Sequence, residues 1–269
     1  STIAINAAYF LPNIDFSLRS LTLTVASSTS LSVYGSTTLS SAITPSGSAT
    51  WTYAGRGNTQ VIISAGRTWT QNVVVSNIGG TVQLGDACTC STAATVTYGT
   101  LDLNNYALTC LVFSATNSNT RTLNFGTSSS ITVTGTTTVF NTGTTTGLTI
   151  SGTNPIVNVT NATATPATVT SGTAVGISNL LSFNFTAGTY SLSTTNNNLY
   201  KALNFTGFAG ILSNTVRTIY GDLVLSTGMT LTAGTAPTTF AGTSGTQTIT
   251  TNGKTLDFPI TFNGAGGTF

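Results

Sequence analysis

One stretch of this sequence recurs further along the chain at an offset of 187, and this repeat restricts the fold more than any other feature. Residues 54–82 align without gaps onto residues 241–269, with ten identities in 29 positions. Upstream of these segments, Val33-Tyr34-Gly35 reappears as Ile219-Tyr220-Gly221. The chain therefore holds one long unit and the start of another, and such repetition is typical of stacked architectures.

A shorter period of about 20 residues runs inside the long unit. Apolar residues alternate with Thr, Ser or Asn, as in Leu21-Thr22-Leu23-Thr24-Val25, which is the pattern of a strand with one buried face. Leu-Asn or Phe-Asn pairs recur at spacings of 20 or its multiples, at Leu103-Asn104, Leu123-Asn124, Phe183-Asn184 and Leu203-Asn204. We therefore predict an all-β chain folded as a parallel β-solenoid, or β-helix, with coils of about 20 residues.

The alternative fold is a tandem pair of β-sandwich domains, which also contains short alternating strands but does not explain the 20-residue register. We expect residues 1–18, which are more apolar than the rest, to form an N-terminal cap. A continuous solenoid is expected over residues 19–269. Within it, residues 136–176 form an irregular stretch rich in Thr, Ser, Gly and Pro. The sequence stops at the position that matches Val82, so we expect a segment of a longer chain.

Charge is almost absent, and this excludes several classes of function. The 269 residues include 7 Lys and Arg, 5 Asp and no Glu or His, for a net charge of +2. Without His or Glu, most acid–base enzymes and His-ligated metal sites are excluded. Seven scattered cations cannot form the basic stripe that nucleic acids require, and no apolar run is long enough to insert into a membrane.

Three cysteines, Cys88, Cys90 and Cys110, are too few for a disulfide scaffold and do not have the spacing of a zinc site. We interpret them as buried or partly buried thiols. We therefore predict no metal site and no cofactor.

The carboxylates and the tryptophans are the remaining candidate site residues. The positions of Asp86 and Asp102 differ by 16 and those of Asp222 and Asp257 by 35, and neither spacing matches the coil. We therefore predict no catalytic residues, although a polysaccharide-degrading β-helix enzyme stays open as the least favoured alternative. Trp51 and Trp69 are candidates for stacking on a glycan, and the competing interpretation places both in the core.

Several segments resemble the Thr/Gly/Asn-rich repeats of tailed-phage fibres and of some bacterial surface adhesins. The resemblance lies in Gly99-Thr-Leu-Asp-Leu-Asn104, Asn119-Thr-Arg-Thr-Leu-Asn-Phe-Gly126, Tyr220-Gly-Asp-Leu-Val-Leu225 and residues 248–262, and it covers most of residues 99–269. It implies a virion or cell-surface fibre that is homotrimeric or laterally associated. The family has no catalytic residues to map onto this chain.

We predict a non-enzymatic structural segment of a phage tail fibre, a tailspike or a surface appendage, located on the virion or outside the cell. The expected partners are further copies of the chain in a homo-oligomer, such as a trimer, and cell-surface glycans. The main alternative is a carbohydrate-binding adhesin or receptor-binding module.

Overall fold

The protein is described by a computed structural model that covers residues 2–5, 7–25, 30–165, 167–172, 180–194 and 198–269. Over those residues the chain forms strands and turns and contains no helix. Strands of successive coils pair in parallel, with about 22 residues to a coil. The predicted β-solenoid is confirmed, and its coils are slightly longer than expected. The alternative of tandem β-sandwiches is wrong, because sandwich sheets are antiparallel.

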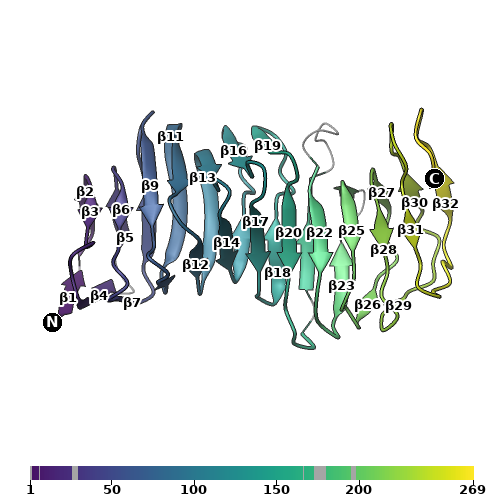
Figure 1. Cartoon of the computed structure of the whole chain (residues 1–269), viewed down its shortest axis with the longest axis horizontal. Coiled ribbons are helices and arrows are strands. Elements are labelled where there is room, and N and C mark those ends of the chain that lie inside the picture. The colour runs from purple at the N-terminus through teal and green to yellow at the C-terminus, as the bar shows by residue number, and fades with distance from the viewer. Residues whose placement is uncertain (1, 6, 26–29, 166, 173–179, 195–197) are drawn as a thin grey trace. The chain divides into compact units, whose positions relative to one another are not determined.

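The chain divides into two compact units, Ser1–Ile131 with Thr146–Asn154, and Thr132–Thr145 with Pro155–Phe269. In Figure 1 the strands of each unit follow one another in layers along the chain. The first boundary between the units, after Ile131, lies within β17 (Ser130–Val133), and further boundaries follow Thr145 and Asn154.

The described residues of the first unit form four runs of hydrogen-bonded parallel strands. The first run is β1 (Thr2–Ile5), β4 (Leu21–Val25) and β7 (Ile43–Ser46), and the second is β10 (Thr68–Trp69), β12 (Cys88–Cys90) and β14 (Ala107–Cys110). The third is β2 (Tyr9–Leu11), β5 (Ser30–Val33), β8 (Thr50–Tyr53), β11 (Asn72–Leu84), β13 (Ala93–Asp102) and β15 (Val112–Ser114). The fourth is β3 (Ile14–Asp15), β6 (Thr37–Thr38), β9 (Thr59–Ile63), then β11 and β13 again, β16 (Arg121–Asn124) and β19 (Leu148–Ser151).

In the second unit, three such runs are formed by the residues that the structure describes. The first is β18 (Thr137–Asn141), β21 (Ala167–Thr170), β23 (Ser191–Thr194), β26 (Ile211–Leu212) and β29 (Thr230–Leu231). The second is β20 (Ile156–Val159), β22 (Ser182–Phe185), β25 (Ala202–Asn204), β28 (Leu223–Val224) and β31 (Ile249–Thr250). The third is β24 (Asn198–Tyr200), β27 (Arg217–Ile219), β30 (Thr238–Phe240) and β32 (Ile260–Phe262).

Strands β11 and β13 belong to two runs because each bends around a corner of the coil. Residues 72–75 of β11 pair with β8, whereas residues 81–84 pair with β9. Between these halves the register of β11 against β13 shifts twice, as expected where a bulge bends a strand. Gly79 and Gly99 lie at this bend with φ of 71° and 77°, a conformation that glycine adopts without strain.

The alternating sequence pattern becomes an alternating burial pattern, and inward residues stack from coil to coil. Leu31 pairs with Trp51 and Trp51 with Val73, and all three side chains are buried. In the second unit the rings of Phe185 and Phe205 stack with centroids 4.8 Å apart at 8°. Each coil thus covers the apolar face of the one before it, which is the source of stability in a solenoid.

The 20-residue spacing of the Leu-Asn and Phe-Asn pairs matches the strand pairing at two places in the second unit and differs from it at one place in the first. Phe183 pairs with Leu203, and Leu203 pairs with Leu223, as the spacing predicts. In the first unit, however, Leu123 pairs with Leu101 in place of Leu103. The 20-residue spacing between Leu103-Asn104 and Leu123-Asn124 therefore does not correspond to a strand pairing. The reason is local, because Asn104 has left the strand and adopts a φ of 49° in the turn that follows.

Coil length also varies in two regions that the sequence singled out. Thr137 pairs with Ala167, which makes this coil longer than its neighbours, and it falls within residues 136–176. Residues 166 and 173–176 of that stretch lie outside the described residues. At the start of the chain, β1, β2 and β3 pair in parallel with β4, β5 and β6, and Tyr9 and Phe10 are exposed.

The two copies of the 187-residue repeat share the same hydrogen bonds from a buried glutamine side chain. Buried Gln60 donates from Nε2 to the carbonyl oxygens of Val33 and Gly35, each at 2.8 Å, and its Oε1 accepts from the Gly55 N–H at 3.1 Å. Its counterpart Gln247 makes the equivalent bonds to Ile219, Gly221 and Gly242. The two matched segments, 33–35 with 54–82 and 219–221 with 241–269, are therefore joined in the same way within each unit.

Candidate functional site

The two tryptophans proposed to contact a glycan lie in the core of the first unit. Trp51 is 0% exposed and Trp69 is 1% exposed. Their rings meet edge to face, with centroids 4.7 Å apart at 80°. Neither ring offers a face to a sugar, so the interpretation of Trp51 and Trp69 as glycan contacts is corrected to core packing. Both occupy inward positions of the strand alternation, where burial of a large ring stabilises the coil.

Three of the five carboxylates accept hydrogen bonds from neighbouring coils. Asp86 accepts from the backbone N–H groups of Ser64 at 2.7 Å and Ala65 at 2.6 Å. Asp222 accepts from the Thr248 N–H at 2.8 Å. Asp102 accepts from the side-chain amides of coils on both sides. These side chains therefore join coils, and each is held by its own set of partners.

The three cysteine side chains are buried in the first unit. A hydrogen bond with Cys90, together with burial, holds the pKa of Cys88 well above its usual value. Burial raises the pKa of Cys110 to about 12. Thiols are nucleophiles and metal ligands in their deprotonated form, so these environments favour a packing role. In the part of the chain that the structure describes, no three His, Cys, Asp or Glu side chains lie together as metal ligands.

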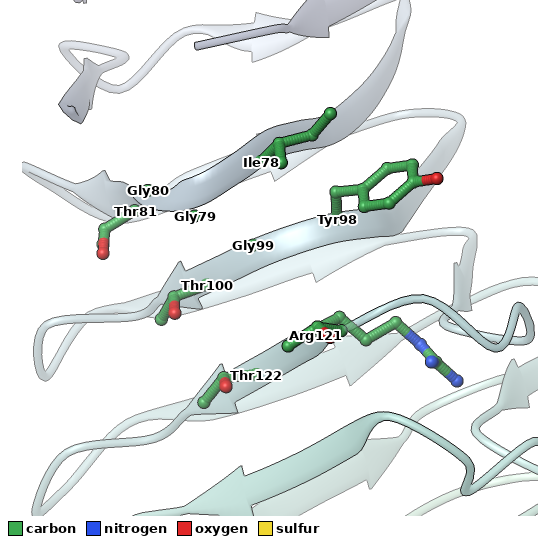
Figure 2. Close-up of a pocket in the computed structure, with 10 residues that line it drawn as sticks. Ile78, Gly79, Gly80, Thr81, Tyr98, Gly99, Thr100, Arg121 and Thr122 are labelled. Carbon is green, nitrogen blue, oxygen red and sulfur yellow. The ribbon is translucent and has the colours of Figure 1, made fainter. Parts of the chain in front are cut away.

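A surface hollow of the first unit lies at the corner where β11 and β13 bend. We call it the corner groove, and its volume is about 460 Å³. Its lining comes from three successive coils and consists of Ile78, Gly79, Gly80, Thr81, Tyr98, Gly99, Thr100, Thr120, Arg121 and Thr122. Figure 2 shows Ile78 and Tyr98 on one side of the glycines and Thr81, Thr100 and Thr122 on the other.

The floor of the corner groove is glycine because the backbones of two coils meet there. A Cβ added to Gly99 would lie 1.9 Å from the carbonyl oxygen of Asn77, and one added to Gly80 would lie 2.4 Å from that of Asn58. Gly79 has open space on its Cβ side. The sequence therefore creates a trough by removing side chains at a bend, and β-strands on each side hold its walls.

The threonine wall belongs to a longer row. Direct pairing aligns threonines in five successive coils of the first unit, namely Thr59, Thr81, Thr100, Thr122 and Thr149. Two residues further along β11, β13, β16 and β19 is a second polar row. In it Gln83 Nε2 donates to Asp102 Oδ2 at 2.8 Å, and Asn124 Nδ2 donates to Asp102 Oδ1 at 3.0 Å.

Arg121 adds no accessible charge to the corner groove, although its atoms contribute to the lining. The side chain is 1% exposed, and its guanidinium points away from the threonine wall in Figure 2. It donates to the carbonyl oxygens of Ala115 at 2.9 Å, Asn119 at 2.7 Å and Thr146 at 2.9 Å. Burial lowers the pKa of Arg121. The groove surface is therefore neutral.

The comparisons with known proteins do not assign this site. The chain matches no protein-family model, no curated protein and no solved structure. Over the described residues, no helix is long and apolar enough to cross a membrane.

Sequence reasoning did not identify the corner groove, although one signal for it was present. Ile78-Gly79 and Tyr98-Gly99 are separated by the short period of the chain. An apolar residue followed by glycine, repeated once per coil, indicates that successive coils bend at the same place. The apolar side chains beside these glycines are then exposed at the bend. The bend itself depends on the register shift in β11, which spacing alone does not reveal.

Proposed function

We propose that the chain is a structural segment of an extracellular or virion-associated fibre, of the tail-fibre or tailspike kind, and that it self-associates as a homo-oligomer. The observation that carries this proposal is the continuity of bonding between coils. In addition to the backbone pairing, Gln83, Asp102 and Asn124 form a side-chain ladder that Ser151 extends by donating to Asn124 Oδ1 at 3.1 Å. Coils joined both by backbone pairing and by such a ladder resist bending and local unfolding.

The surface chemistry supports association between copies. Only 4% of the residues are charged, so little electrostatic repulsion opposes the approach of two faces. Exposed Phe10, Leu18 and Tyr34 add apolar area to the outside of the first unit. The resemblance of residues 99–269 to fibre repeats favours the same function. Few and scattered cations argue against nucleic acid as a partner.

We further propose that the chain is not an enzyme. The support is that Asp86, Asp102 and Asp222 already accept hydrogen bonds that join coils. Incubation with capsular or algal polysaccharide is expected to release no reducing ends. Release by the wild type that is lost in Asp222→Ala or Asp257→Ala would contradict this.

The fibre proposal is tested by sedimentation equilibrium and limited proteolysis of the same preparation. We expect an oligomer at micromolar concentration and slow cleavage, because the strands are paired on both sides within each unit. A monomer at that concentration that is rapidly digested would overturn the proposal. Antibody labelling of intact virions and cells then tests the location.

A further inference from the structure

The corner groove is long enough to accommodate an extended ligand that crosses several coils. Its lining comes from three coils in succession, and adjacent strands of a sheet lie ~4.8 Å apart. This spacing is close to the length of one pyranose ring in an oligosaccharide. A ligand of three or more sugar units would therefore meet a repeating surface, with an equivalent threonine at each step.

The two walls of the corner groove differ in a way that matches the two surfaces of a sugar. Ile78 is 45% exposed, and together with the half-buried ring of Tyr98 it forms an apolar wall. The opposite wall presents the hydroxyl groups of Thr81, Thr100 and Thr122. A pyranose has C–H groups on its ring faces, which pack on aromatic and aliphatic side chains, and hydroxyls at its edge, which bond to threonine.

The electrostatics of the corner groove restrict the ligand further. The lining includes no carboxylate, and the guanidinium of Arg121 is held by backbone carbonyls of its own unit. A phosphorylated or carboxylated ligand would enter this trough without a cation to bind it. The chemistry therefore favours an uncharged ligand that hydrogen-bonds weakly at many points.

The corner groove is also rigid before any ligand arrives. Its walls stand on β11, β13 and β16, which pair with one another in parallel. The glycines of its floor meet backbone atoms closely at Gly80 and Gly99. Binding would therefore cost little conformational entropy in the protein, which compensates for weak individual contacts.

We propose that the corner groove is a binding site for a neutral glycan chain, which runs from coil to coil with its ring faces against Ile78 and Tyr98 and its hydroxyls toward Thr81, Thr100 and Thr122. This goes beyond the fibre proposal and does not depend on it, because a fibre can assemble whether or not its surface binds sugar. The site is also separate from Trp51 and Trp69, which the structure buries.

Isothermal titration calorimetry with four probes tests the proposal. The probes are cellohexaose, maltohexaose, mannohexaose and, as the charged comparison, a hexamer of galacturonic acid. We expect one or more of the neutral hexasaccharides to bind and the acidic one to bind at least ~10-fold more weakly than the best of them. Failure of all three neutral probes to bind at millimolar concentration would overturn the proposal, as would preference for the acidic probe.

Variants then locate the site. Tyr98→Ala is expected to weaken binding ~10-fold through loss of ring stacking, and Tyr98→Phe to retain it within ~2-fold. Tyr106→Ala is the matched control, because Tyr106 is an exposed tyrosine of the same unit outside the groove. Equal binding by Tyr98→Ala and Tyr106→Ala would overturn the assignment.

A second pair of variants covers the case in which Tyr98→Ala does not fold. Thr100→Val preserves side-chain volume and removes one hydroxyl from the wall, so we expect ~5-fold weaker binding. Thr109→Val makes the same change on β14, outside the groove. Unchanged binding by Thr100→Val would count against the hydroxyl wall. A change of oligomeric state in Tyr98→Ala, with no sugar bound by the wild type, would assign the groove to a protein interface instead.

Discussion

At the scale of single residues, two of the few charged side chains of this protein, Arg121 and Arg217, are buried and hydrogen-bonded within it. The Arg121 guanidinium donates to the carbonyl oxygens of three residues, and Arg217 donates to the Ser213 carbonyl at 2.6 Å and the Thr215 hydroxyl at 3.1 Å. Both side chains are buried, and burial lowers the pKa of each. Arginine suits this role because its planar group offers five donors to several carbonyls at once.

Buried Tyr190 carries a prediction about alkaline pH. Burial raises its pKa from 10.0 to about 12, because the core disfavours the phenolate. A raised pKa of this kind stabilises the fold below pH 10, and that contribution is lost as pH rises from 10 to 12. We expect the wild type to lose about 1.4 kcal/mol more of its free energy of unfolding between pH 8 and pH 11 than Tyr190→Phe does.

Urea unfolding of both proteins at the two pH values measures this difference. At pH 8 we expect Tyr190→Phe to be as stable as the wild type or up to about 1 kcal/mol more stable, since the Tyr190 hydroxyl has no hydrogen-bond partner among the described residues. Parallel loss of stability in the two proteins from pH 8 to pH 11 would show that this phenol does not contribute.

At the scale of elements, the bend in β13 requires glycine at position 99 both for its positive φ and for the close approach of a neighbouring backbone. A matched pair of glycine-to-alanine variants separates these two requirements. Gly57 and Gly99 both have a φ of 77°. A Cβ on Gly57 would meet nothing within 4 Å, whereas a Cβ on Gly99 would collide with the Asn77 carbonyl. We expect Gly57→Ala to cost about 1 kcal/mol of backbone strain and Gly99→Ala at least about 2 kcal/mol more from the collision.

Denaturant midpoints of the two variants test this, with the wild type as reference. Equal losses for Gly57→Ala and Gly99→Ala would mean that the coils move apart at the corner without cost. The same result would weaken the view that close backbone contact forms the floor of the corner groove.

The repeated glutamine gives a second prediction for an element. Gln60→Ala leaves one buried carbonyl, one partly buried carbonyl and one buried N–H without their side-chain partner, so we expect a loss of about 3 kcal/mol. Gln83→Ala is the control, because Gln83 is half-buried and bonds to Asp102 on the outer face, and we expect a loss below about 1 kcal/mol. Similar losses, measured by urea unfolding, would show that the shared glutamine is not what fixes this turn.

At the scale of the whole molecule, the sequence predicted the class of fold because its evidence is periodic. Alternation shows which residues of a strand share a face, and the long repeat shows which turns share the hydrogen bonds of a buried glutamine. Coil lengths were harder to predict, because the chain adds residues at turns without changing the pattern of the strands. The shift from Leu103 to Leu101 as the partner of Leu123 is one example. The corner groove was missed because it depends on a register shift between strands, which no spacing within one strand reveals.

Sparse charge is a property of the whole sequence, and stacking explains it. A side chain on an outer face has its counterpart one coil away at ~4.8 Å, so a charge repeated by the sequence would face its own copies. Thr89 and Thr109 are such counterparts, paired directly between β12 and β14. We expect the double variant Thr89→Lys/Thr109→Lys to lose about 0.5–1 kcal/mol more free energy of unfolding than the sum of the losses in the two single variants.

Reversal of one charge provides the control for this prediction. In Thr89→Asp/Thr109→Lys the coupling between the two positions is expected to be favourable and of similar size, and 1 M salt should reduce both couplings because screening then acts within about 3 Å. Urea unfolding of the two double-mutant cycles measures these energies. Zero coupling in both cycles at low salt would mean that stacking does not select against charge, and the near-absence of charged residues would then be attributed to the association of copies through their faces.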